Sequence, residues 1–138
     1  TWLNDRDSEP DADGGKGIAR YQYNSKNAAD DYLTTKNPVT LKAGANCISF
    51  YYRTSSSTNY PERFEVLYGK SSDVTTMTVI ASLIDKKTKE WVASINDFEV
   101  AEAGDYYFSF HAISEKNKGS IYIDKAALME CRILLWKI

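Results

Sequence analysis

Acidic residues crowd residues 1–17 of the chain and are its best candidates for metal chemistry. The stretch is otherwise polar and glycine-rich and predicts a long loop. The candidate ligands are the carboxylates of Asp5, Asp7, Asp11 and Asp13. Calcium takes about six to eight oxygen ligands, from carboxylates and carbonyls on flexible backbone, and this composition supplies them. The spacing does not fit an EF-hand loop. A structural calcium site is one interpretation, and a merely solvated loop is the other.

Asp124 is a further candidate ligand because it lies in an otherwise apolar segment. Ile123 precedes it and Ala126 follows two positions later. A carboxylate in such surroundings is costly unless a cation or several hydrogen-bond donors compensate it. We expect Asp124 either to bind a cation or to accept hydrogen bonds from backbone amides.

Catalytic chemistry has little support in the sequence. His111 is the one histidine, so it cannot anchor a typical zinc site, and no recognised nucleophile motif accompanies it. A glycosidase needs two carboxylates that face each other across a cleft. The candidates are expected in turns or on outward-facing positions: Glu62, Glu65, Asp97, Glu99 and Asp105. We therefore expect a structural role for His111 and no enzymatic activity, with a small glycoside hydrolase as the least favoured alternative.

Tyrosines are the candidates for a binding surface, since the chain has ten of them. Tyr51, Tyr60 and Tyr107 each fall on a loop or on the strand face opposite the strongest core residues. A tyrosine ring can lie flat on a sugar while its hydroxyl forms a hydrogen bond. These three residues are predicted to contact a glycan; ordinary cross-strand packing is the competing interpretation.

Composition bounds the remaining classes. The chain has 138 residues, which fits one domain, and a formal net charge of -2 with scattered Lys and Arg. No basic stripe exists to bind nucleic acid, and no apolar run approaches the ~20 residues of a transmembrane helix. Cys47 and Cys131 are far apart and form no CxxC pair. A disulfide between neighbouring strands and two separate small apolar residues both stay open.

The elements that must position these residues are short strands. Cys47 to Arg53 alternates apolar and polar side chains, the pattern of a strand with one buried face. Helical periodicity is confined to one turn near residues 71–77. Similar strands are predicted at 18–23, 32–35, 39–41, 63–68, 77–84, 91–100, 106–111 and 121–123. This pattern indicates an all-β fold, a jelly-roll sandwich of two antiparallel sheets spanning residues 1–130.

An ordered set of phrases resembles one family. They are ADDYLTT at 29–35, LKAG at 41–44, ISF at 48–50, YPERFEV at 60–66, GDYYFSFHA at 104–112 and IYID at 121–124. Together they resemble the cleaved-adhesin or choice-of-anchor J family, which includes the adhesin modules of gingipains. The resemblance covers roughly residues 1–128.

The resemblance implies a β-sandwich similar to MAM and carbohydrate-binding modules, exported to the surface of a Gram-negative bacterium. It implies a non-catalytic adhesion module that contacts a glycan or a host surface protein. It also implies that calcium is held between the loop after Trp2, with Asp5 and Asp7, and Asp124. A structural spacer or assembly module that binds no soluble ligand is the alternative function.

Two departures from the family accompany the resemblance. The first strand of the family is missing, and the chain starts at Thr1 without Met or signal peptide, as a trimmed fragment would. Residues 131–138 form an apolar tail, which ends in ILLWKI. The simplest interpretation of the tail is a final core strand. Two alternatives are the start of a following domain and an interface strand. In the latter case the tail would fill the slot of the missing strand, within one chain or between two chains.

Overall fold

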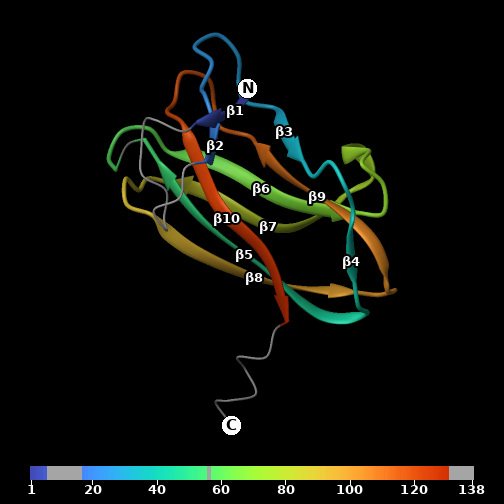
Figure 1. Cartoon of the computed structure of the whole chain (residues 1–138). Coiled ribbons are helices and arrows are strands. Elements are labelled where there is room, and N and C mark those ends of the chain that lie inside the picture. Colours follow the sequence, from blue (N-terminus) through green and yellow to red (C-terminus); the bar gives the residue numbers. More distant parts are fainter. Residues whose placement is uncertain (6–16, 56, 131–138) are drawn as a thin grey trace.

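The computed structural model describes residues 1–5, 17–55 and 57–130, and it contains two antiparallel β-sheets packed face to face (Figure 1). In spatial order, sheet A contains β1 (Trp2–Asp5), β2 (Ile18–Tyr21), β10 (Ile121–Glu130), β5 (Gly44–Thr54) and β8 (Val92–Val100). Sheet B contains β3 (Asp31–Thr34), β9 (Gly104–Ala112), β6 (Glu62–Gly69) and β7 (Thr78–Lys86), with β4 (Val39–Leu41) also paired to β9. The predicted all-β, two-sheet sandwich is confirmed.

Strand β5 shows how the sequence pattern produces the core. Ile48, Phe50 and Tyr52 are each at most 5% exposed, whereas Tyr51 between them is 39% exposed. Successive side chains of a strand point to opposite faces of the sheet, and from Ile48 to Tyr52 burial follows this alternation. On the opposite face, Cys47 and Arg53 are buried as well. The inner face therefore belongs to the apolar residues.

Aromatic rings join the two sheets at the centre of this core. Phe50 of β5 lies 6.0 Å from the Phe64 ring of β6 and 5.2 Å from the Phe110 ring of β9, with edge-to-face geometry in both pairs. Tyr52 lies 5.6 Å from the Phe64 ring. Such pairs contribute about 0.5–1.5 kcal/mol each beyond the burial of their surface.

One edge of the sandwich is incomplete. Strand β2 pairs with β10 only over Ile121–Ile123, whereas β5 pairs with the opposite edge of β10 as far as Glu130. The β5 register shifts between Asp124 and Ala127, and Lys125 in this bulge has a φ of 54°. A bulge of this kind bends the strand that carries it. Because β2 begins at Ile18, no strand of the described chain pairs with the outer edge of residues 126–130.

The predicted secondary structure is confirmed in one further detail and differs from the structure in two. The prediction of a loop over residues 1–17 is wrong at Trp2–Asp5, which form β1. The segment is too short to carry a strand pattern, and Trp2 fixes it: its ring packs on Tyr21, and its indole N–H donates to the Asp31 carbonyl at 3.0 Å. The predicted helical turn is confirmed as a 3-10 helix at Val74–Thr76. The final strand is longer than predicted and reaches Glu130.

The structure also bears on the bonding of the cysteines and on the possibility of a membrane-spanning helix. Cys47 is disulfide-bonded, and the chain's other cysteine, Cys131, lies outside the described residues. Within the described ranges, no helix has the length and apolar character needed to cross a bilayer.

Candidate binding sites

A shallow pocket at one end of the sandwich, which we call the rim pocket, collects exposed tyrosines and polar groups. It has a volume of about 330 Å³, and three chain segments form it: the one after β2, the one after β5 and the loop from β9 to β10. Its lining residues are Tyr23, Ser55, Tyr60, Asn117, Lys118 and Gly119. These residues are distant in sequence, so the pocket exists only in the folded chain.

Tyr23 and Tyr60 supply the apolar surfaces of the rim pocket. Their side chains are 45% and 46% exposed, among the most exposed large hydrophobic residues of the described chain. A tyrosine offers an apolar ring with a polar hydroxyl, so it can contact the apolar face of a sugar and hydrogen-bond to it as well. Asn117 and Lys118 add hydrogen-bond donors beside the rings.

Gly119 lines the rim pocket at a position where a residue with a side chain would not fit. A Cβ atom at Gly119 would lie 2.0 Å from the Ser55 hydroxyl oxygen and 2.8 Å from a Glu62 carboxylate oxygen. Both neighbours also hold the loop: the Ser120 N–H donates to Ser55 Oγ at 2.9 Å, and the Gly119 N–H donates to a Glu62 carboxylate oxygen at 2.5 Å. The loop is therefore held against the ends of β5 and β6 through its backbone.

Asn24 fixes the segment that carries Tyr23. Its side-chain oxygen accepts hydrogen bonds from the backbone N–H groups of Lys26 and Asn27, at 2.8 and 3.0 Å. Its backbone carbonyl accepts a hydrogen bond from the N–H of Asn117 at 2.8 Å, and Asn117 has a φ of 57°, which asparagine tolerates well. These contacts connect the segment after β2 to the β9–β10 loop.

Glu62 lies beneath the rim pocket rather than in it. The prediction that this residue occupies a turn or an outward-facing position is wrong, because its side chain is fully buried at the start of β6. Burial raises the pKa of Glu62 to about 7, against opposing interactions with Ser114, Gly119 and Lys118. Its carboxyl group is inaccessible to solvent and accepts a hydrogen bond from the Gly119 N–H, so it supports the loop from within the fold.

The three predicted tyrosines are not brought together. Tyr60 lies in the rim pocket, Tyr51 is exposed on the outer face of sheet A, and Tyr107 is half-buried on β9 of sheet B. Sequence analysis missed Tyr23, which falls just after a strand. Its signal was the neighbouring polar run from Asn24 to Asn27, which is typical of a turn.

The predicted calcium ligands lie partly outside the described residues. Asp5 pairs with Ile18, and Asp124 directly follows the residue that pairs with Ala19, so both carboxylates lie on the outer face of sheet A beside Ile18. Arg20 already places a cation 3.1 Å from the Asp5 carboxylate, and Asp124 accepts a hydrogen bond from the Lys125 N–H at 2.8 Å.

Asp7 is not among the described residues, which themselves hold no group of three His, Cys, Asp or Glu residues suited to a metal. Two carboxylates on one face fit part of the oxygen-rich set that calcium requires. The calcium site therefore stays a prediction.

His111 is part of a local network on sheet B. One ring nitrogen lies 2.7 Å from an Asp30 oxygen and the other 3.1 Å from a Glu65 oxygen. The Tyr32 ring stacks on the imidazole with centroids 3.8 Å apart. These contacts attach β3 to β9 and β6, which agrees with the structural role predicted for His111.

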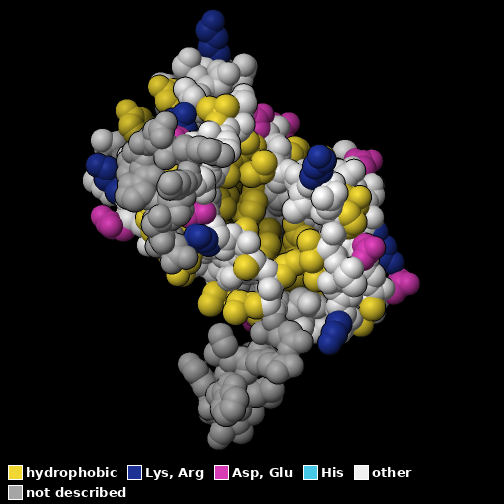
Figure 2. Space-filling model, in the orientation of Figure 1, with side chains coloured by type: hydrophobic (Ala, Val, Ile, Leu, Met, Phe, Trp, Pro, Cys, Tyr) yellow, Lys and Arg dark blue, Asp and Glu magenta, His cyan; other side chains and the backbone are white. Residues whose placement is uncertain are grey.

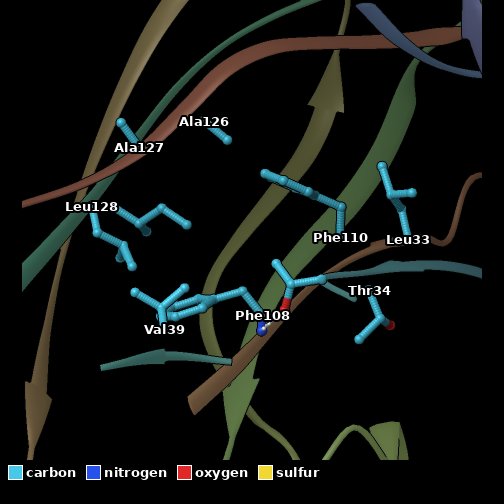
Figure 3. Close-up of a pocket in the computed structure, with 10 residues that line it drawn as sticks. Leu33, Thr34, Val39, Phe108, Phe110, Ala126, Ala127 and Leu128 are labelled. Carbon is cyan, nitrogen blue, oxygen red and sulfur yellow. Dashed lines mark hydrogen bonds between the residues drawn. The ribbon is translucent and has the colours of Figure 1, made fainter. Parts of the chain in front are cut away.

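A second, larger hollow lies between the two sheets at the incomplete edge, and we call it the apolar groove. It has a volume of about 600 Å³. Its lining residues are Leu33, Thr34, Thr35, Val39, Ile48, Phe108, Phe110, Ala126, Ala127 and Leu128. Figure 3 shows side chains from β3, β4 and β9 facing those of β10 across it. In Figure 2 hydrophobic side chains line the hollow. Thr34 and Thr35 are the only polar residues in this lining, and their hydroxyls already form hydrogen bonds with Ser109 and with the Phe108 N–H. The groove is therefore less suited to a sugar than to apolar side chains.

Comparisons with known proteins place the fold. No protein-family model and no curated protein matches the sequence. The K1 cleaved adhesin domain of Lys-gingipain from Porphyromonas gingivalis W83 superposes with a TM-score of 0.72 at 14% identity, over 94% of this chain and 83% of that one. The K2 domain of the same protein gives 0.69 at 17% identity, over 93% and 82%.

A carbohydrate-binding module is similar as well. TmCBM61, solved in complex with β-1,4-galactotriose, gives a TM-score of 0.61 at 12% identity and covers 94% of this chain and 88% of its own. Identities this low establish the fold alone. The resemblance found in the sequence is therefore confirmed at the level of fold: the chain is a β-sandwich of the kind seen in cleaved adhesin domains and carbohydrate-binding modules.

Proposed function

We propose that this chain is a non-catalytic binding module that takes glycan in the rim pocket. The observation that carries the proposal is the pairing of Tyr23 and Tyr60, two exposed rings beside polar groups, over a loop held by Gly119. A ligand site gains affinity when its groups are already fixed before binding. The hydrogen bonds of Ser55, Glu62 and Asn24 provide that fixation.

The size and shape of the rim pocket favour one or two sugar units at the end of a glycan. Its volume of about 330 Å³ lies near the lower end of typical small-molecule sites, and it is open to solvent. Lys118 lines the pocket and adds a positive charge to it. Its Nζ atom lies 3.7 Å from a Glu115 carboxylate oxygen. The ligand class is therefore a neutral or acidic glycan with an exposed apolar sugar face.

The fold neighbours support this proposal in two ways. One of them was solved with a bound β-1,4-galactotriose, which makes that trisaccharide a reasonable first probe. Others are adhesin domains of Lys-gingipain. They support a role at the surface of a Gram-negative bacterium or in its surroundings, where glycans and host proteins are the available partners.

The test is a glycan array followed by isothermal titration calorimetry on the full chain, starting with β-1,4-galactotriose. A tyrosine ring that lies on a sugar contributes a large apolar contact area, so Tyr23→Ala and Tyr60→Ala should each lower affinity by roughly tenfold or more. Tyr51→Ala is the matched control, because Tyr51 is similarly exposed but lies outside the pocket. Equal loss in Tyr51→Ala, or a blank array, would reject the proposal.

A further inference from the structure

The incomplete edge of sheet A is a site where another strand can be added. Ala127–Glu130 of β10 pair with β5 along one edge. Among the described residues, no strand pairs with the other edge beyond Ile123, where the pairing with β2 ends. An edge strand presents a row of backbone N–H and C=O groups, which readily pair with another extended segment. Addition of a strand to such an edge is a recurrent mode of protein recognition.

The apolar groove lies directly beside this edge and exposes part of the core. Phe108 and Phe110 are at most 9% exposed, yet both line the groove together with Leu128. Leu128 is only partly buried although it packs against the hydrophobic core. A strand added beside β10 would send every second side chain into this space, so the occupant must carry apolar residues at alternate positions.

The chain itself contains a segment with that pattern. Residues 132–138 read RILLWKI, with Leu134, Trp136 and Ile138 at alternate positions. They follow β10 immediately, because β10 ends at Glu130. The segment that could fill the groove is therefore adjacent in sequence to the unpaired edge of β10. It could pair with the β10 strand of its own copy or with that of a second copy.

Pairing within one copy would require a tight reversal just after Glu130. Two-residue hairpin turns depend on Gly, Asn or Asp at positions with positive φ. The residues available for the reversal are Cys131, Arg132 and Ile133, none of which is of that kind. A second copy needs no reversal, since the two β10 strands can simply continue past each other.

We propose that two copies of this chain associate by antiparallel pairing of their β10 strands, each extended by its residues 132–136. A twofold axis at Cys131 places Leu134 of one copy opposite Leu128 of the other, and Trp136 opposite Ala126. Directly opposite residues of an antiparallel pair point to the same face. Leu128 faces the core, since its β5 partner Ile48 does, so Leu134 and Trp136 enter the groove.

This register agrees with the shape of the groove and with the position of β2. Ala126 is small and exposed at its lip, which leaves room for the large Trp136 ring. The added strand would also lie end to end with β2 along one edge of β10, because β2 occupies only Ile121–Ile123. The two A sheets then form one continuous sheet, a self-complementary interface of the twofold type.

Sedimentation of the full chain over a concentration series tests the proposal. The wild-type chain should reach the mass of a dimer, and the double variant Leu134→Lys/Trp136→Lys should remain a monomer at every concentration. The matched control is Ile133→Lys/Leu135→Lys, which places the same charges in the same segment but on the outward face, and it should stay dimeric.

A wild-type chain that is monomeric throughout would overturn the proposal, as would equal behaviour of the inward and outward variants. Circular dichroism confirms that each variant is folded. Tyr23→Ala and Tyr60→Ala should remain dimeric, because the rim pocket lies apart from the groove, so failure of the glycan proposal and failure of this one are distinguishable.

Discussion

A carboxylate oxygen of Glu62 accepts a hydrogen bond from the backbone N–H of Gly119 at 2.5 Å, although the two residues are 57 positions apart in the chain. Glu62 begins β6, and Gly119 belongs to the loop between β9 and β10. The contact couples a buried titratable group to the floor of the rim pocket. Protonation of Glu62 and the shape of that pocket are therefore linked.

The first prediction concerns pH. The pKa of Glu62 rises from 4.5 to about 7 on folding, so the folded chain binds the additional proton in that range. This contribution to stability is fully present below pH 4.5 and is lost as pH rises to about 7. A pKa shift of this size corresponds to roughly 3 kcal/mol as an upper estimate.

Glu62→Gln tests this link because glutamine keeps an oxygen that can accept from Gly119 and does not ionise. The free energy of unfolding of the variant, measured with urea, should equal that of the wild type below about pH 4.5 and exceed it increasingly up to about pH 7. A difference between the two chains that stays constant with pH would contradict the raised pKa.

The second prediction concerns Gly119→Ala. The added Cβ would overlap Ser55 Oγ and crowd Glu62, so the loop must move. Overpacking of this kind costs about 1–3 kcal/mol, and the rim pocket should lose its glycan affinity at the same time. Gly104→Ala is the control, since its Cβ would find its nearest contact at 4.0 Å. Thermal unfolding and calorimetry measure both effects; full binding by Gly119→Ala would show that the loop does not shape the site.

The third prediction concerns the aromatic core. Phe64 is 0% exposed and contacts the rings of Phe50, Tyr52 and Phe110. Phe64→Ala should lower the free energy of unfolding by about 3–5 kcal/mol, the usual cost of such a cavity. Ile95→Ala, at a side chain that is 56% exposed, should change it by less than about 0.5 kcal/mol. Similar losses in the two variants would mean that the sheets do not pack as described.

The fourth prediction concerns calcium. If Asp5 and Asp124 help to bind the ion, millimolar calcium should raise the unfolding temperature and a chelator should reverse the rise, because a ligand of the folded state stabilises it. Asp124→Asn should abolish the calcium-dependent difference. Asp105→Asn should preserve it, since Asp105 lies on sheet B and binds Thr40. An unfolding temperature that calcium does not change in the wild type would remove the metal from the account.

The strands were predictable where a single face is buried. In β5 the alternation of Ile48, Phe50 and Tyr52 with polar neighbours is visible in the sequence because burial acts on every second residue. Trp2–Asp5 could not be recognised as a strand, since its pairing with β2 and the Trp2 contact to Asp31 are tertiary.

The rim pocket was only partly predictable for the same reason. Tyr60 was identified as an exposed aromatic residue, but its pairing with Tyr23 depends on three loops that meet only after folding. Glu62 was misplaced because a lone glutamate next to a turn usually points to solvent. Its burial depends on the close approach of Gly119, a contact between distant segments that no local pattern reveals.

Chemical-shift mapping tests the central claim most directly. The ¹⁵N-labelled full chain is titrated with β-1,4-galactotriose, or with the strongest glycan from the array, and each backbone amide is followed. The account predicts that the shifts concentrate at Ser55, Asn117, Lys118, Gly119 and Ser120 around the rim pocket. Shifts confined to the outer face near Tyr51 or to the apolar groove would contradict it.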